Sequence, residues 1–165
     1  MITKTAYNKA PINKIKTENR NCTISKLVTG DLIKTKGQKY PLIYHYGIVE
    51  KNLDGLFIIH NHPDKINSNG GNTVREPLEK WIKNRDVVSV EQTDLKLEDI
   101  EKIYQTLKMH KYDFINFNCE HFVNFAKDKS YVSPQVLRWT SVALIGLAIY
   151  FLLKNKRIWT QYQVK

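Results

Sequence analysis

The sequence predicts an α+β fold in which a small antiparallel β-sheet packs on helices, followed by a hydrophobic helix near the C-terminal end. Two observations lead to this class. Several short runs of β-branched and aromatic residues are separated by turn residues, and later segments repeat their apolar residues with helical spacing. With 165 residues, of which 42% are hydrophobic, the chain has room for one core, so we expect a single folded domain.

Four segments are expected to form the strands of the sheet. Each combines Val, Ile, Leu, Tyr or Phe with Gly or Asp near its boundaries, as antiparallel strands joined by turns do. They are residues 30–35, 40–50, 55–60 and 86–92. Asp54-Gly55 is typical of a hairpin turn. Residues 61–73, NHPDKINSNGGNT, have the composition of a loop.

Helices are expected in two places within this domain. Apolar residues recur at intervals of three and four over residues 97–107, with charged residues between them, which predicts a surface helix with one apolar face. Phe122, Val123 and Ala126 share a helical face in the same way. Cys119 then falls in the first turn of the second helix.

The segment near the C-terminus differs because residues 139–153, WTSVALIGLAIYFLL, carry no charge. As a helix they reach about 22 Å, against roughly 30 Å for the hydrocarbon core of a bilayer, so a buried core helix is the alternative. Aromatic residues near both ends and the basic residues that follow favour a membrane span. We predict a membrane-anchor helix over residues 136–154 and a basic tail over residues 155–165.

The formal net charge of +10 suggests an acidic partner, which is nucleic acid, anionic lipid or an acidic protein. The basic positions are not interleaved with aromatic residues and match no nucleic-acid-binding module, so no nucleic acid is expected. The first 30 residues hold six Lys or Arg against one Glu. Residues 1–26 therefore predict a flexible basic arm, with a merely solvated tail as the alternative.

Cysteine usage indicates a reducing compartment. Cys22 and Cys119 are too few for a disulfide framework, and residues 1–20 lack the apolar core of a secretory signal. Cys119 is the candidate nucleophile, because a thiol at a helix N-terminus beside an imidazole has a lowered pKa.

The imidazole must come from another part of the fold. His121 is a poor partner for Cys119, because two residues along a helix turn a side chain about 200° away. His45 and His60 lie in consecutive predicted strands. Paired across a hairpin, one would accept the thiol proton and the other would fix its tautomer.

Four stretches together resemble the lecithin:retinol acyltransferase family, and most closely its small phospholipase and acyltransferase branch. They are NCEHFVNFA at residues 118–126, GDLI at 30–33, YHYGIV at 44–49 and IIH ending at His60. The resemblance runs from about residue 30 to residue 153. It implies a permuted NlpC-like, papain-type fold with a catalytic domain over residues 27–133.

Carried over residue by residue, the resemblance makes Cys119 the nucleophile, His45 the base and His60 the second histidine that orients it. It implies a thiol phospholipase A or acyltransferase acting on a glycerophospholipid, with backbone amides at the helix start holding the oxyanion and an acyl-thioester as intermediate. No cofactor and no metal are expected. The protein would be single-pass, held by the C-terminal helix and the basic arm, with its catalytic domain facing the cytoplasm.

The third site position has two candidates. The link from His45 to His60 is longer than is usual in that family, so His62 is the alternative. His60 is preferred because it ends an apolar strand, whereas His62 lies in the turn before Pro63. The family's usual Trp after the base is Tyr46 here.

Two other functions fit parts of the sequence. His60-Asn61-His62 resembles the His-x-His of zinc isopeptidases of the JAMM type, but the serine and aspartate that this pattern requires downstream are Gly70 and Thr73 here. The second is a membrane-anchored interaction or membrane-remodelling protein with the same fold and little turnover. The sequence leaves this second alternative open.

Overall fold

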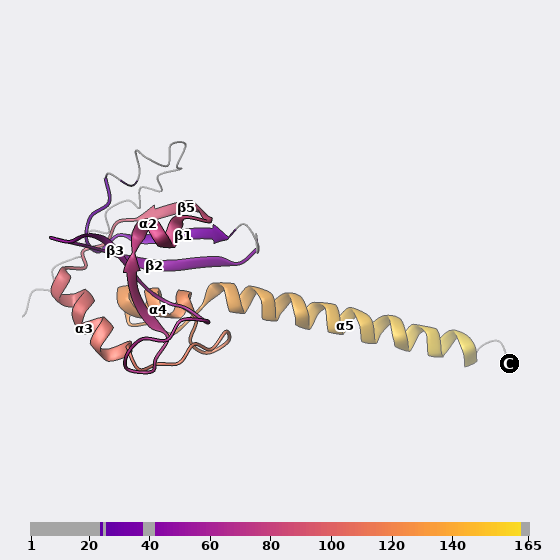
Figure 1. Cartoon of the computed structure of the whole chain (residues 1–165). Coiled ribbons are helices and arrows are strands. Elements are labelled where there is room, and N and C mark those ends of the chain that lie inside the picture. The colour runs from indigo at the N-terminus through magenta and orange to yellow at the C-terminus, as the bar shows by residue number, and fades with distance from the viewer. Residues whose placement is uncertain (1–23, 25, 38–41, 163–165) are drawn as a thin grey trace, which may run out of the picture. The chain divides into compact units, whose positions relative to one another are not determined.

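A five-stranded antiparallel sheet is the centre of the computed structural model, which describes residues 24, 26–37 and 42–162 (Figure 1). Its strands are β1 (Leu32–Gly37), β2 (Tyr44–Asn52), β3 (Gly55–Asn61), β4 (Thr73–Pro77) and β5 (Arg85–Glu91). The strand order is β4-β3-β2-β1-β5, so β1 to β4 form a meander and β5 returns beside β1. The predicted α+β class with an antiparallel sheet is confirmed. The basic arm predicted for residues 1–26, with Cys22, lies almost wholly outside the described residues.

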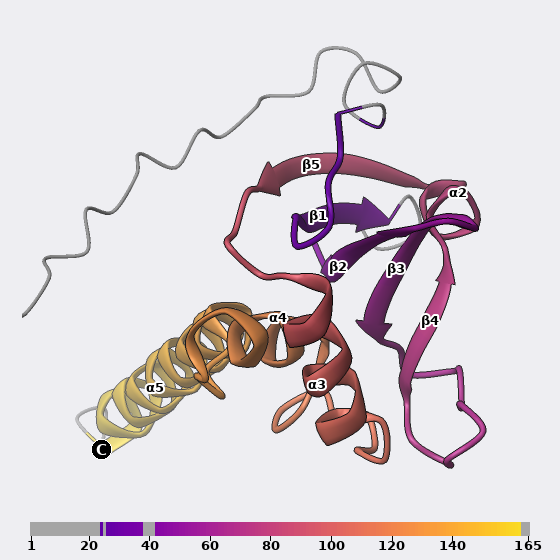
Figure 2. The same ribbon diagram turned by 90° about the vertical axis from the view of Figure 1, so that its left-hand side faces the viewer.

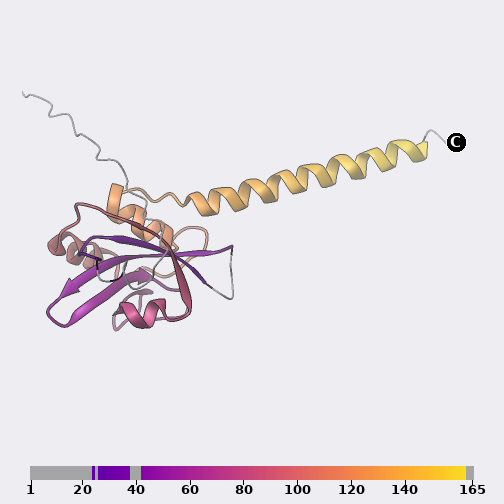
Figure 3. The ribbon, with the colours of Figure 1, turned by 90° about the horizontal axis from the view of Figure 1, so that it is seen from above.

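Among the described residues, three helices pack on this sheet. They are α2 (Leu78–Ile82), α3 (Leu97–Leu107) and α4 (Cys119–Asp128). Figure 3 shows α2 and α4 on opposite sides of the sheet, and Figure 2 shows α3 beside α4. The bounds of α3 are those that its apolar spacing predicts.

Each face of the sheet carries its own apolar cluster, because side chains alternate along a strand. Leu32, Ile48 and Ile59 are cross-strand neighbours on one face and pack against α3 and α4. On the other face Val49 and Ile58 are paired and pack against α2. The sheet is therefore the middle layer of three, and α4 packs against one of its faces.

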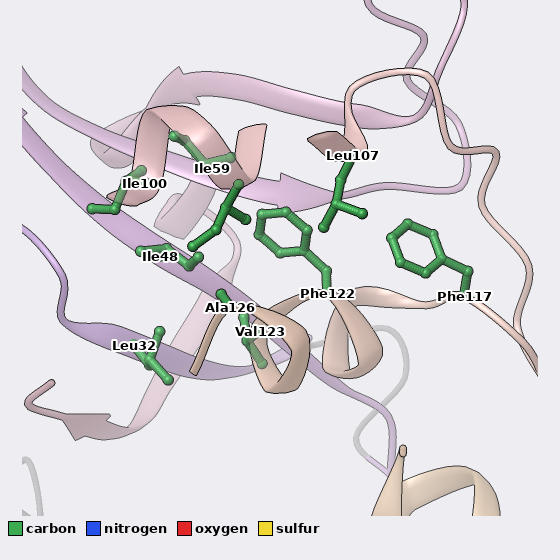
Figure 4. Packing of buried hydrophobic residues seen from close by; sticks show 10 residues of the cluster. Leu32, Ile48, Ile59, Ile100, Leu107, Phe117, Phe122, Val123 and Ala126 are labelled. Atoms are coloured by element: carbon green, nitrogen blue, oxygen red, sulfur yellow. The ribbon is translucent and has the colours of Figure 1, made fainter. Parts of the chain in front are cut away.

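Phe122 anchors α4 to the sheet. Its side chain is fully buried and lies among Ile48, Ile59 and Leu107 (Figure 4). Burial of a side chain of this size stabilises the fold by about 1.5–3 kcal/mol. Because Cys119 precedes Phe122 by less than one helical turn, this packing also sets the position of the thiol relative to the sheet.

β4 and α2 lie outside the predicted elements. β4 begins at Thr73, where the predicted loop ends, and its only large apolar residue is Val74. Its other buried positions, Thr73 and Glu76, are polar. They are tolerated inside because they are bonded: the Thr73 hydroxyl donates to the carbonyl oxygen of Leu107 at 3.1 Å, and Glu76 binds His60. A strand of this kind has no apolar alternation to reveal it.

The chain divides into two compact units, residues 1–131 and 132–165. The second contains the long helix α5 (Pro134–Tyr162). Its segment Pro134–Asn155, 22 residues with a mean hydropathy of 1.9, is long and apolar enough to span a membrane. At 1.5 Å per residue it reaches about 33 Å, more than the 22 Å of the uncharged run, because the helix continues at both ends.

Candidate active site

Asn118 caps the helix that carries the cysteine. Its side-chain oxygen accepts the backbone N–H groups of Glu120 at 2.9 Å and His121 at 3.1 Å. In return Nδ1 of His121 accepts the backbone N–H of Asn118 at 3.2 Å. This reciprocal pair is a capping box. His121 is therefore part of the cap, and the cap makes Cys119 the first residue of α4.

The sulfur of Cys119 lies against an edge of β2. The thiol donates to the carbonyl oxygen of Tyr44, with Sγ and O 3.7 Å apart, and the backbone N–H of Tyr46 donates to the sulfur. β2 pairs with β3 only from Ile48 onward, so the start of α4 meets the part of β2 that extends beyond β3. Tyr44 and Tyr46 flank His45. The fold thus brings the candidate nucleophile to the backbone on both sides of the candidate base.

Close packing beside this edge requires glycine at position 47. A Cβ on Gly47 would lie 2.6 Å from Cγ1 of Ile58 and 3.2 Å from the carbonyl oxygen of Ile59. Any larger residue would push β2 away from β3 and move the strand that carries His45.

Burial raises the pKa of the Cys119 thiol to about 11. The residue is only 3% exposed, and the charge of Glu120 raises the pKa further. Backbone N–H groups, including that of Tyr46, act in the opposite direction without reversing the shift. The lowered pKa expected from the helix N-terminus is therefore wrong for this structure, because desolvation outweighs it. The thiol is protonated at neutral pH.

Three histidines gather near this edge. The ring of His45 stacks on that of His62, with centroids 6.0 Å apart and planes at 14°. His62 meets His60 edge to face, with centroids 5.5 Å apart and planes at 82°. His60 also packs on Trp81 at 5.6 Å. His62 is thus the ring that contacts both of the others.

A carboxylate binds the buried ring of His60. Nε2 of His60 lies 2.8 Å from Oε1 of Glu76, and Nζ of Lys65 lies 2.5 Å from both oxygens of Glu76. His60 and Glu76 are buried, whereas Lys65 is partly exposed. Hydrogen bonds from His60 and Lys65 lower the pKa of Glu76 to about 2, so it is anionic at neutral pH.

His45 is a neutral imidazole at neutral pH. Burial lowers its pKa to about 3, and the charge of Arg85 and the neighbouring His60 and His62 add to the effect. Its Nδ1 is buried without a hydrogen-bond partner within the described part of the chain. A neutral imidazole can accept a proton, so His45 is in the state that a general base needs.

Arg85 adds a positive charge to the site, although no sequence pattern singled it out. Its guanidinium donates to the carbonyl oxygen of Trp81 at 2.5 Å and lies over the Trp81 ring. Its charge acts on both Cys119 and His45. Arg85 opens β5, which reaches the site only because β5 returns beside β1, and no local motif predicts that pairing.

A second unpredicted contact joins α4 to β2. The hydroxyl of Tyr46 hydrogen-bonds to the buried carboxylate of Glu120. Because Glu120 follows Cys119 and Tyr46 follows His45, this bond ties the residues next to the nucleophile to those next to the base.

The three predicted site residues do not all contact one another. Cys119 meets the strand backbone around His45, whereas His60 contacts His62 and Glu76. In residues 24, 26–37 and 42–162, no group of three or more His, Cys, Asp or Glu is placed to hold a metal ion.

The comparisons with known proteins overturn the resemblance drawn from the short motifs. A family model described as the PPPDE putative peptidase domain matches residues 5–155, which is most of the chain. No match was found among curated proteins or solved structures. The assignment to the lecithin:retinol acyltransferase family is therefore wrong, and with it the phospholipase and acyltransferase activities.

The physical reason lies in what the motifs encode. Asn118, His121 and Phe122 cap and anchor a helix, as helices of many families require, so the Asn-Cys-Glu-His-Phe stretch is less specific than it looks. The permuted NlpC-like, papain-type topology is likewise not confirmed. What is shown is an α+β fold with a five-stranded antiparallel sheet. The chain belongs to the PPPDE putative peptidase family.

Proposed function

We propose that this protein is a cysteine peptidase in which Cys119 is the nucleophile and His45 the general base. One observation carries the proposal: Sγ of Cys119 lies 3.7 Å from the carbonyl oxygen of Tyr44, the residue next to His45. A cysteine at the start of a helix, beside a strand that bears a neutral histidine, is the arrangement that thiol acyl transfer needs. Membership in a family described as peptidases supports the same activity.

The electrostatics favour a neutral Cys–His pair before substrate binds. With a thiol pKa of about 11, ionising Cys119 alone at pH 7 costs about 6 kcal/mol, which is four pH units at about 1.4 kcal/mol each. The low pKa of His45 also disfavours an imidazolium. Proton transfer to His45 therefore accompanies attack of the sulfur, and no stable ion pair precedes it.

The proposed reaction has two steps. In the first, His45 takes the thiol proton while Sγ of Cys119 bonds to the carbonyl carbon of an amide. The C–N bond then breaks, and the leaving amine takes the proton from His45, which leaves a thioester on the enzyme. In the second, water gives a proton to His45 and attacks the thioester. The C–S bond breaks, the acid product leaves, and Cys119 regains its proton.

The oxyanion of each tetrahedral intermediate needs backbone donors. The N–H groups of Glu120 and His121 already donate to the side chain of Asn118. The N–H groups of Cys119 and Tyr46, which act on the sulfur at rest, are therefore the donors we assign to the oxyanion. The N–H of Cys119 comes from the start of α4 and that of Tyr46 from the edge of β2. The site therefore depends on the packing of α4 against β2.

The bond cleaved is a peptide or isopeptide amide, and amides to the C-terminus of a ubiquitin-like modifier are the first to test. A panel of fluorogenic peptides and of ubiquitin-like modifiers with a C-terminal fluorogenic amide, incubated with the full chain in detergent, measures this activity. We expect release from at least one substrate, lost in Cys119→Ser and retained in His110→Gln. Release that Cys119→Ser leaves unchanged would contradict the proposal. Absence of release, with Cys119→Ser behaving as the wild type in cells, would favour the non-catalytic interaction protein instead.

We also propose that α5 places this peptidase on a membrane, with the domain on the cytoplasmic side. The apolar segment Pro134–Asn155 supports the attachment by length and composition. The free thiol of Cys119 supports the orientation, because the cytoplasm keeps cysteines reduced. Substrates would then be proteins at the same membrane surface.

A further inference from the structure

The ring of His45 has one aromatic neighbour among the described residues, and that neighbour is His62. The two rings lie nearly parallel with centroids 6.0 Å apart, an offset-stacked pair. Nδ1 of His45 is buried and without a hydrogen-bond partner among the described residues. No hydrogen bond at that atom fixes the ring, so its orientation depends on the face it stacks against.

The tautomer of His60 is set by its carboxylate partner. Glu76 is anionic and can only accept, so Nε2 of His60, 2.8 Å from Oε1, carries the proton. A neutral His60 then has a lone pair on Nδ1. That atom is buried and has no hydrogen-bond partner within the described residues. His60 thus offers a buried acceptor that a donor on a neighbouring group would satisfy.

The tautomer of His62 is set from the opposite side. Its Nδ1 accepts the backbone N–H of Asp64 at 3.0 Å, so a neutral His62 carries its proton on Nε2. His62 therefore has a donor, and the His60 ring with its lone pair lies edge to face with it, centroids 5.5 Å apart. The two tautomers are complementary.

We propose that His62, and not His60, is the residue that positions the ring of His45. Lys65 and Glu76 hold His60 in place, and the edge-to-face contact with His60 limits the orientations open to the ring of His62. This rests on the proposed function, in which His45 is the base. His62 is a positioning residue, since it acts only through His45.

Charge explains why a neutral ring is needed there. When His45 takes the thiol proton it becomes an imidazolium, and Arg85 on β5 already faces it with a positive charge. Lys65 is also close, but Glu76 binds its ammonium. A charged His62 would add a further repulsion, whereas the face of a neutral ring attracts a cation. Burial keeps the pKa of His62 at about 4, in agreement with this role.

The tautomers can be measured without any substitution and without any activity. The chain has five histidines, so histidine-selective ¹⁵N and ¹³C labelling of the full chain in detergent micelles gives a spectrum of five residues. We expect His60 and His62 both in the Nε2–H form at pH 7. A His60 that carries its proton on Nδ1, or a His62 that is charged at pH 7, would overturn the proposal.

The same labelled protein reports on positioning. His62→Ala opens the stacked face of His45 to water, so the titration of His45 should move up by at least one pH unit toward its ordinary value. His62→Phe keeps a neutral aromatic face and should leave the titration near that of the wild type. His110→Ala, an exposed histidine outside the site, is the matched control. An unchanged His45 titration in His62→Ala would overturn the proposal.

Kinetics separate this inference from the proposed function. On an active amide substrate, His62→Ala should lower kcat by about threefold to tenfold, the size of one aromatic pair, with KM unchanged and the acid limb of the pH profile moved upward. His62→Phe should recover most of the rate. If His45→Asn leaves kcat intact, the proposed function fails. If His45→Asn abolishes kcat while His62→Ala does not change it, only the role of His62 fails.

Discussion

Cys119 and Tyr44 are 75 residues apart in the chain, and the sulfur of one lies 3.7 Å from the carbonyl oxygen of the other. The contact joins the first residue of α4 to the part of β2 that extends beyond β3. The backbone of His45, the next residue of that strand, therefore lies close to the start of the helix. The site depends on two local structures, which are the N-terminal cap of α4 and the close packing of β2 against β3. Each can be tested by itself.

The cap of α4 rests on Asn118, and Asn118→Ala removes the acceptor for two buried N–H groups. We expect the free energy of unfolding to fall by about 1–2 kcal/mol, as for other N-caps. Asn118→Ser keeps a capping oxygen and should recover most of the loss. Urea unfolding followed by circular dichroism measures both. Equal stability of the Ala and Ser variants would contradict the role of the cap.

The close packing of β2 against β3 depends on the absence of a side chain at Gly47. Gly47→Ala places a methyl group 2.6 Å from Cγ1 of Ile58, so we expect a loss of about 1–3 kcal/mol from overpacking. Ile58→Ala removes the atoms in the way. The Gly47→Ala substitution should therefore cost less in an Ile58→Ala background than in the wild type. Additive losses in urea unfolding would show that the two positions do not compete for space.

Glu76 is the buried anion between His60 and Lys65. Glu76→Gln removes the charge and leaves one acceptor oxygen, so we expect the free energy of unfolding to fall by about 1–3 kcal/mol. Glu79→Gln, an exposed carboxyl on α2, is the matched control and should stay within about 0.5 kcal/mol. A Glu76→Gln protein as stable as this control would exclude a structural role for the buried pair.

Stability should fall in acid in two windows. His45 and His62 have lowered pKa values, about 3 and about 4. The unfolded chain therefore binds more protons than the native state below pH 6.5, and stability falls as the pH drops from 6.5 to about 4 for His62 and to about 3 for His45. The slope is about 1.4 kcal/mol per pH unit for each proton taken up on unfolding. Glu76, with a pKa of about 2, adds a second loss between pH 4.5 and 2.

Urea unfolding at fixed pH values measures this profile. In a protein with both His45→Asn and His62→Phe the upper window should shrink, and in Glu76→Gln the lower window should shrink. A stability that is flat from pH 6.5 to 4.5 in the wild type would contradict the neutral state of these histidines.

The sheet was largely predictable because its strands are marked by local pattern. β2 and β3 combine β-branched residues with an Asp54-Gly55 turn, and α3 shows its apolar face at helical spacing. β4 was not predicted because two of its three buried residues, Thr73 and Glu76, are polar and have their partners far away in the sequence. A local sequence pattern shows the type of each side chain, but it does not show where a partner distant in sequence will lie.

The site was predictable only in outline. A cysteine after Asn118 and a histidine on a strand were visible as candidates, but the raised pKa of Cys119 depends on burial, which no motif encodes. Arg85 lies at the site because β5 pairs with β1, and the sequence did not predict that pairing. The order of the histidine rings, with His62 in contact with His45, follows from side-chain directions at the end of β3 and could not be derived from spacing.

Membrane attachment should depend on α5. A chain that ends after Ser133 lacks the apolar segment Pro134–Asn155 and should move to the soluble fraction of a cell lysate, while the full chain pellets with membranes. A chain that lacks residues 1–23 but keeps α5 should still pellet with membranes, because the basic arm alone binds a membrane weakly. If the chain without α5 still pellets and the one without the arm does not, attachment is electrostatic.

The account depends most on the sulfur of Cys119 forming the acyl-enzyme with His45 as its base. Acid quench within the first turnover of an amide substrate, followed by peptide mapping in a mass spectrometer, measures this directly. The account predicts an acyl group on Cys119 and none on Cys22, with no acyl-enzyme in His45→Asn and normal amounts in His110→Gln. Equal acylation in His45→Asn, or turnover with the acyl group on Cys22, would contradict it.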